Sequence, residues 1–141
     1  MPITPFSDRT AIIDIIASDP YIESLGFLPI NILNTAYSDE KLEEDTFQIF
    51  VFNAASQDGN TSIYLSPVIE IDISVPQSYS SEAQRAAEQI IALLQDKKVN
   101  GHTEFEIIAP SPVNLPCQFG YECIGIRFRY NATVFNKVKT V

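Results

Sequence analysis

Residues 68–98 read VIEIDISVPQSYSSEAQRAAEQIIALLQDKK, and no other part of the chain says more about its fold. The first part alternates apolar residues with Glu70, Asp72 and Ser74, which predicts a strand with one face in a core and an acidic face toward solvent or a neighbour. The second part, residues 81–98, carries small and aliphatic residues at the spacing of one helix face. A strand followed by a long amphipathic helix predicts a sheet that a helix packs against.

The segments on either side supply further strands. Downstream, residues 102–109 and 123–134 are rich in β-branched and aromatic residues and predict two strands, while Asn100 and Gly101 end the long helix. Upstream, residues 46–53 (TFQIFVFN) predict another strand for the same reason.

Helices are expected before the first strand. Residues 7–17 carry isoleucines at helical spacing, and Asp19-Pro20 marks the start of a short second helix that Gly26 ends. Together these elements predict one α+β domain over residues 1–141. It has a mainly antiparallel sheet of about four strands, packed by one long helix, with an N-terminal helix.

The outer faces of two predicted strands carry opposite charges. In the strand at 123–134, Arg127 and Arg129 lie on the face opposite the apolar residues. If this strand pairs with the one that holds Glu70 and Asp72, acids and arginines lie across from each other, each pair worth a fraction of a kcal/mol. We interpret the acidic face as a solvated sheet surface.

Composition and charge exclude several classes of partner. The chain has 141 residues, 45% hydrophobic and 19% charged, as is ordinary for a globular protein. Nine basic and eighteen acidic side chains give a net charge of −9. Because Lys and Arg supply most of the affinity for phosphates, we do not expect the chain to bind DNA or an anionic membrane. No apolar run approaches the ~20 residues that cross a bilayer, and we do not expect the first residues to act as a signal peptide.

The sequence offers no catalytic, cofactor-binding or metal-ligating residue that we can identify. His102 is the sole histidine, and its place at the start of a strand predicts a polar surface residue. Glycine motifs that bind phosphates or dinucleotides are absent from the sequence. Cys117 and Cys123 are too few for a disulfide scaffold, so we interpret them as buried or half-buried thiols, with a local disulfide as the alternative. We therefore expect a binding and assembly protein, not an enzyme.

Aromatic residues crowd the last quarter of the chain. Residues 110–121 contain three prolines and predict a semi-rigid projecting loop, with Phe119 and Tyr121 near its end. Aromatic side chains on such a loop are hard to bury within one domain and are enriched in protein interfaces. We therefore expect the loop to contact another subunit.

Three stretches resemble the small tail-terminator and tail-completion proteins of long-tailed bacteriophages. They are VIEIDISV at 68–75, SSEAQRAAEQIIALL at 80–94 and GIRFRYNATV at 125–134, and the resemblance extends over residues 45–135. Proteins of this family form a ring, typically a hexamer, that caps the finished tail tube, offers a surface to the head and lets DNA pass.

The resemblance implies a role, partners and contact residues. The chain would be a structural protein of the virion tail or neck, made in the bacterial host cytoplasm, with no cofactor and no membrane contact. Its partners would be further copies of itself, the tail tube and head-connector proteins, and its acidic charge would let DNA pass without specific binding. Contacts would come from the loops at 53–62 and 110–121 and from the outer strand face. The expected interface residues are Phe119, Tyr121, Arg127, Arg129 and Asp58.

Other functions stay open on the sequence alone. A head-completion or neck connector protein fits the same features. A non-viral interaction module could bind one partner through an exposed strand edge. A small enzyme that uses paired carboxylates would need a deep pocket lined by acids of perturbed pKa.

Overall fold

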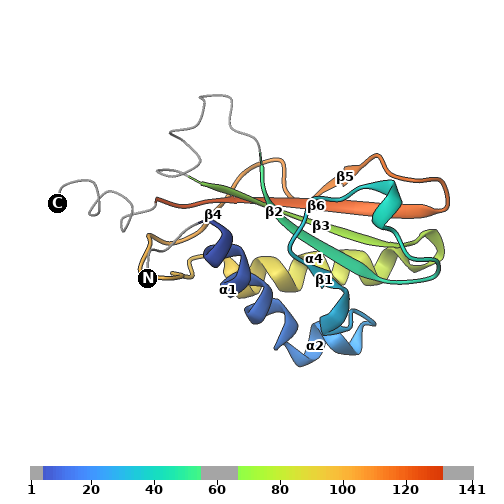
Figure 1. Cartoon of the computed structure of the whole chain (residues 1–141), viewed down its shortest axis with the longest axis horizontal. Coiled ribbons are helices and arrows are strands. Elements are labelled where there is room, and N and C mark those ends of the chain that lie inside the picture. Colours follow the sequence, from blue (N-terminus) through green and yellow to red (C-terminus); the bar gives the residue numbers. More distant parts are fainter. Residues whose placement is uncertain (1–4, 55–66, 132–141) are drawn as a thin grey trace.

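The strands form one mixed sheet, and the helices lie on one side of it (Figure 1). The structure is a computed structural model that describes residues 5–54 and 67–131. Its strands are β1 (Ile32–Leu33), β2 (Gln48–Asn53), β3 (Val68–Pro76), β4 (Glu106–Ile107), β5 (Val113–Leu115) and β6 (Tyr121–Arg129). Its helices are α1 (Pro5–Ala17), α2 (Pro20–Ser24) and α4 (Ser80–Leu94), with single 3-10 turns η1 (Pro29–Asn31), η2 (Asp39–Lys41) and η3 (Gln77–Tyr79).

The central strand of the sheet is β3, which the alternating pattern predicted as a strand without giving its place in the sheet. The strand order is β1-β2-β3-β6-β4, and β5 pairs with β6 beside this path. Ile71 of β3 lies opposite Val51 of β2 and Ile126 of β6, both in antiparallel register. The expectation of about four strands was too low, and β1 runs parallel to β2. Because β1 and β5 have only two and three residues, no alternating pattern marks them.

The hydrophobic core lies between the sheet and the helices. On α4 the buried side chains are the predicted apolar stripe, namely Ala83, Ala86, Ala87, Ile90 and Leu94. They face the isoleucines of the strands, including Ile69, Ile71 and Ile73, which are fully buried. Burying one such side chain is worth about 1.5–3 kcal/mol, so this layer supplies much of the driving force for folding.

The long helix ends at Leu94, before the predicted end at residue 98. Gln95 leaves the helical conformation, and Asp96 has a left-handed φ of 64°. The backbone N–H of Asp96 donates to the carbonyl of Phe105 at 3.1 Å. The N–H of Phe105 in turn donates to the carbonyl of Lys97 at 3.0 Å. Pairing with a later segment therefore ends the helix, which the local sequence could not reveal.

Both predicted N-terminal helices are present. The carboxylate of Asp19 caps α2 by accepting from the N–H of Ile22 at 3.0 Å, and the amide of Gln89 on α4 donates to the same carboxylate at 3.2 Å. Gly26 has φ +117°, and a Cβ there would lie 2.8 Å from the ring of Phe47. Glycine is therefore required after α2 for both its conformation and its size.

The second face of the sheet is covered, and the expectation of a solvated acidic face was wrong. Residues 34–46 run over this face (Figure 1). Residues 108–115 lie along the edge beside β6 and cover the face with side chains such as that of Leu115, next to Gly125. The side-chain amide of Gln48 donates to the carbonyl of residue 41 at 3.0 Å, which holds the first of these segments down. Glu70 and Asp72 beneath them are only 7% and 5% exposed. An alternating pattern shows that two faces differ, but not that the polar one meets water.

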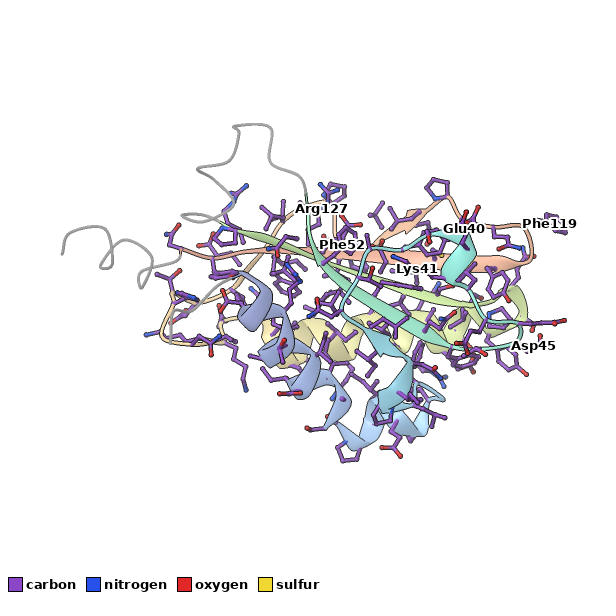
Figure 2. All side chains as sticks on the ribbon, in the orientation of Figure 1. Glu40, Lys41, Asp45, Phe52, Phe119 and Arg127 are labelled. Carbon is purple, nitrogen blue, oxygen red and sulfur yellow. The ribbon has the colours of Figure 1, made fainter. Side chains whose placement is uncertain are left out.

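Within the predicted projecting loop at 110–121, the three residues of β5 form an edge of the sheet. Leu115 of β5 lies opposite Cys123 of β6 in antiparallel register. The turn before β6 reaches the end of the molecule, where Phe119 points outward (Figure 2). The strand expected at 102–109 shortens to the two residues of β4. β6 ends at Arg129, and the predicted continuation to residue 134 lies outside the described residues.

Candidate assembly surface

A pair of carboxyl groups is buried at the centre of the second face. Glu70 and Asp72 lie on the same side of β3, opposite Arg127 and Gly125 of β6. Arg127 donates from Nε to Oε1 of Glu70 at 2.7 Å, which confirms the predicted cross-strand pairing for this arginine. Because the arginine side chain is 56% exposed, solvent screens the ion pair and limits its contribution.

Asp72 has a different environment from Glu70. A Cβ on Gly125 would lie 3.2 Å from Oδ1 of Asp72 and 2.6 Å from the side chain of Leu115. Glycine at this position therefore leaves space for the side chains of Asp72 and Leu115. Within the described residues, this buried Oδ1 has no hydrogen-bond partner. Burial raises the pKa of Asp72 to about 8, the hydrogen bond and charge of Glu70 add to this, and Arg127 opposes it. Asp72 is therefore mostly protonated at neutral pH.

The acid pair has little room for a substrate. The hollow beside it has a volume of about 180 Å³, below the roughly 300–1,000 Å³ of typical ligand pockets. Glu70 and Arg127 line it together with apolar residues of the covering segment 108–115. No group of three or more His, Cys, Asp or Glu side chains is placed to hold a metal ion in the part of the chain that the structure describes. The pair can share a proton and bind the arginine.

A second buried polar cluster joins α1 to the other end of β6. Asp8 is fully buried; its Oδ1 accepts from the amide of Asn100 at 2.7 Å, and its Oδ2 accepts from the hydroxyl of Tyr130. His102 Nε2 lies 3.2 Å from the same Oδ2. His102 is only 2% exposed, so the expected surface position was wrong. Burial and the neighbouring Asp8 raise the pKa of Tyr130, which keeps its hydroxyl a hydrogen-bond donor.

Phe119 and Tyr121 lie near each other in sequence but have different environments. Phe119 is 98% exposed at the end of the molecule where β6 begins (Figure 2). Tyr121 is half-buried, and its hydroxyl donates to the carbonyl of Glu43 at 3.2 Å. In the same turn, the N–H of Gln118 donates to the hydroxyl of Tyr37 at 3.1 Å. Phe119 is therefore available for contact with another protein, whereas Tyr121 ties the turn to the covering segment.

A groove with an apolar wall, which we call the end groove, lies at the same end of the sheet. It has a volume of about 490 Å³, and its lining includes Leu25, Leu28, Asn31, Asp45, Phe47 and Tyr79. Leu28 and Tyr79 are 49% and 47% exposed, and Ile30 close by is 80% exposed. The ring of Phe47 packs against that of Tyr79 with 5.1 Å between centroids, so the two rings form a continuous aromatic part of the wall.

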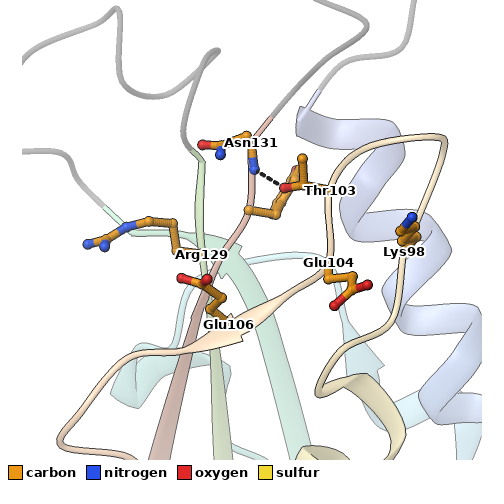
Figure 3. A pocket seen from close by; sticks show the side chains of 7 residues that line it. Lys98, Thr103, Glu104, Glu106, Arg129 and Asn131 are labelled. Atoms are coloured by element: carbon orange, nitrogen blue, oxygen red, sulfur yellow. Dashed lines mark hydrogen bonds between the residues drawn. The ribbon is translucent and has the colours of Figure 1, made fainter.

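The opposite end of the sheet holds an open, charged hollow (Figure 3). Its volume is about 380 Å³, and it is lined by Lys98, Thr103, Glu104, Glu106, Arg129, Tyr130 and Asn131. Arg129 lies opposite Glu106 of β4 on one side and Val68 of β3 on the other, so it has no acidic partner on β3. Because both signs of charge line this hollow, it favours neither an anion nor a cation.

The expected interface residues do not converge on one site. Phe119 and Tyr121 lie at one end of the sheet, Arg127 lies over its second face, and Arg129 lies at the other end. Asp58 lies outside the described residues. The sequence did not predict the end groove, because residues 28–37 show neither a helical nor a strand pattern. Its only trace in that stretch is a pair of large apolar residues, Leu28 and Ile30, on either side of Pro29.

The fold defined by these elements is an α+β arrangement of a mixed sheet with helices on one face. Among solved structures, it is similar to a chain described as "Virion of native gene transfer agent (GTA) particle", with a TM-score of 0.58 and 13% sequence identity. The match covers 87% of this chain and 92% of that chain. At this identity the likeness shows a shared fold. No protein-family model matches the chain, and no curated protein matches it.

The helices of the described residues include none with the length and apolar character needed to cross a membrane.

Proposed function

We propose that this chain is a structural protein of a virion and that it assembles as a ring at the end of a phage tail, as a tail terminator. The observation that carries the proposal is the similarity of its fold to a chain from the virion of a gene transfer agent, a phage-like particle. The match extends over most of both chains. The finer role is supported by the resemblance at 68–75, 80–94 and 125–134, segments that contribute to β3, α4 and β6.

The two ends of the molecule suit contacts between copies. One end carries Phe119 and the end groove, and the other carries the charged hollow. When two different surfaces of identical subunits bind each other, the copies close into a ring if the rotation between them closes. We propose that the ring is a hexamer, as the resemblance to tail-terminator proteins implies.

The charge of the chain supports passage of DNA through such a ring. With a net charge of −9, the protein repels phosphates more than it attracts them. Its partners would be its own copies, the tail tube and the head connector, at the tail or neck of the virion. We also propose that it is not an enzyme, because Glu70 and Asp72 are covered and the hollow beside them is small.

A head-completion or neck connector protein is the second candidate. It rests on the same similarity to a virion chain, which does not distinguish positions within a particle. Only the place of the protein on the particle separates the two roles.

Electron microscopy of purified particles, with an antibody against this protein, tests the proposal. We expect the label at the head-proximal end of the tail tube. Label between the connector and the head would favour the second candidate, and purified particles without the protein would contradict both. In addition, the purified protein should form a ring when mixed with tail tubes, and light scattering that shows only monomers in this mixture would contradict the ring.

A further inference from the structure

We propose that the end groove binds the C-terminal segment 132–141 of a second copy of this chain, and that this is the contact that joins neighbouring copies. The inference rests on the proposed ring for its biological meaning, but the contact itself can be tested in solution. It requires a groove of suitable chemistry, a segment that fits it, and a geometry that favours a neighbouring copy over the segment's own groove.

The end groove combines an apolar wall with an acidic rim. Leu28 and Tyr79 are about half exposed, and Ile30 is 80% exposed, so the wall offers apolar area that residues 5–54 and 67–131 leave open. Asp45 lines the groove, and Glu43 and Glu44, directly before it in sequence, are also exposed. An occupant with apolar side chains and positive charge would therefore complement it.

The C-terminal segment has this chemistry. Residues 132–141 read ATVFNKVKTV, with two lysines and no acidic residue, so the segment carries +2. The rest of the chain has seven basic and eighteen acidic residues, a net charge of −11. Val134, Phe135 and Val138 supply apolar side chains among the lysines. In this acidic protein, the segment is the best match to an acidic, apolar groove.

The position of the segment favours the groove of another copy. The segment follows Asn131, beyond the end of β6, whereas the groove lies at the end where β6 begins. The nine residues of β6 span about 30 Å at roughly 3.3 Å per residue. Ten extended residues reach at most about 33–36 Å, so the segment would have almost no slack to return around its own body. A neighbour placed head to tail presents its groove at this end, and repetition of that contact gives a ring where the rotation between copies closes.

Cross-linking between two full-length variants tests this contact. One variant carries Ile30→Cys beside the groove, and the other carries Val138→Cys in the segment. Both carry Cys117→Ser, while Cys123 stays because it is buried. The two proteins differ in mass by a tag, are mixed at high concentration and are treated with a short bismaleimide. We expect a heterodimer joined through the two new cysteines, identified by mass spectrometry.

Charge reversal gives a matched control for the contact. Adding Lys137→Glu and Lys139→Glu to the segment variant should lower the yield of heterodimer roughly tenfold. Glu43→Lys and Glu44→Lys on the groove variant should then restore it, which a merely unfolded protein would not do. A Val113→Cys variant, also apolar and exposed but on β5, should give little heterodimer with the segment variant.

Three outcomes would overturn the inference. They are no heterodimer at Ile30→Cys, an equal yield at Val113→Cys, or an intrachain link alone when one chain carries both cysteines. The last outcome would mean that the segment binds its own groove. If the heterodimer forms but the protein is absent from tails, the proposed function fails and the contact stands. If the protein caps tails without this heterodimer, the contact fails and the proposed function stands.

Discussion

At the scale of single residues, Glu70 and Asp72 show how burial under a covering segment changes the environment of a carboxyl group. Both acids alternate with isoleucines, and this pattern is typical of a strand with one wet face. Burial under residues 34–46 and 108–115 instead raises the pKa of Asp72 to about 8, from an ordinary value of 3.8. The groups that face it are Glu70 on its own strand, and Arg127 and Cys123 on β6. A buried acid of this kind makes folding depend on pH.

We predict that Asp72→Asn weakens the pH dependence of stability. Because the pKa is raised in the folded protein, the folded chain holds a proton that the unfolded chain releases between pH about 4 and about 8. The free energy of unfolding of the natural protein should therefore fall as the pH rises through this window. At about 1.4 kcal/mol per pKa unit, the shift from 3.8 to about 8 corresponds to a loss of roughly 6 kcal/mol over the whole window, and roughly 4 kcal/mol of it lies between pH 5 and 8. Urea unfolding of both proteins at several pH values between 5 and 9 measures it.

The control is the comparison of the two proteins, because they share every titrating group except Asp72. Its unfolding free energy should change less with pH, and at pH 9 it should exceed that of the natural protein. Parallel curves for the two proteins would show that Asp72 is ionised in the folded state and would contradict the prediction.

At the scale of elements, the attachment of α1 to the sheet depends on a polar contact. The helix places Asp8 where Tyr130 and Asn100, from beyond β6 and α4, both donate to its carboxylate. A carboxylate this deeply buried is stable only when hydrogen bonds replace its water. The cluster therefore fixes one orientation of α1 on the sheet, which a purely apolar helix face would leave less specified.

We predict that Tyr130→Phe lowers the free energy of unfolding by about 1–3 kcal/mol, since it leaves the buried carboxylate of Asp8 without one of its donors. Asp8→Asn should also destabilise, and the double variant should lose less than the sum of the two single losses. Urea unfolding of the four proteins gives this coupling. Tyr21→Phe, at a tyrosine that is 44% exposed, is the control and should change stability by less than about 0.5 kcal/mol. If the losses of Tyr130→Phe and Asp8→Asn add strictly in the double variant, the predicted coupling between these two side chains is wrong.

At the scale of the whole molecule, the two ends of the sheet are chemically different. Phe119, Ile30 and the end groove make one end apolar with an acidic rim, whereas charges of both signs line the hollow at the other end. Exposed apolar residues gathered at one place mark contact surfaces more reliably than scattered ones. This asymmetry suits a contact between unlike ends and therefore an assembly with a direction.

We predict that Phe119→Ala impairs assembly without affecting folding. Because the side chain is 98% exposed, its loss should change the free energy of unfolding by less than about 0.5 kcal/mol. Tyr121→Ala should lower both the free energy of unfolding and assembly, because the hydroxyl of Tyr121 donates a hydrogen bond to the carbonyl of Glu43. Thermal unfolding measures folding, and co-sedimentation with tail tubes measures assembly. Unchanged co-sedimentation of the Phe119 variant would remove this residue from the contact surface.

Local patterns were enough to predict most helices and long strands. The alternation in β3, the apolar stripe of α4, and the Asp19 cap with Gly26 after α2 all act within a few residues, so neighbouring side chains carry the signal. The pairing of Glu70 with Arg127 could also be predicted, because strand register follows from which faces are apolar. The short strands β1 and β5 carry no such signal and form only because β2 and β6 offer them partners.

The sequence by itself therefore determined the class of fold, the alternating strand at 68–75, the packing helix and the acidic charge. Tertiary structure alone decided that the acidic face is buried, that His102 lies inside, and that a groove opens beside Tyr79. The physical reason is distance along the chain. Tyr37 meets Gln118 across 81 residues, and Asp8 meets Tyr130 across 122. Contacts of this kind set burial and pKa, and no local pattern of residues encodes them.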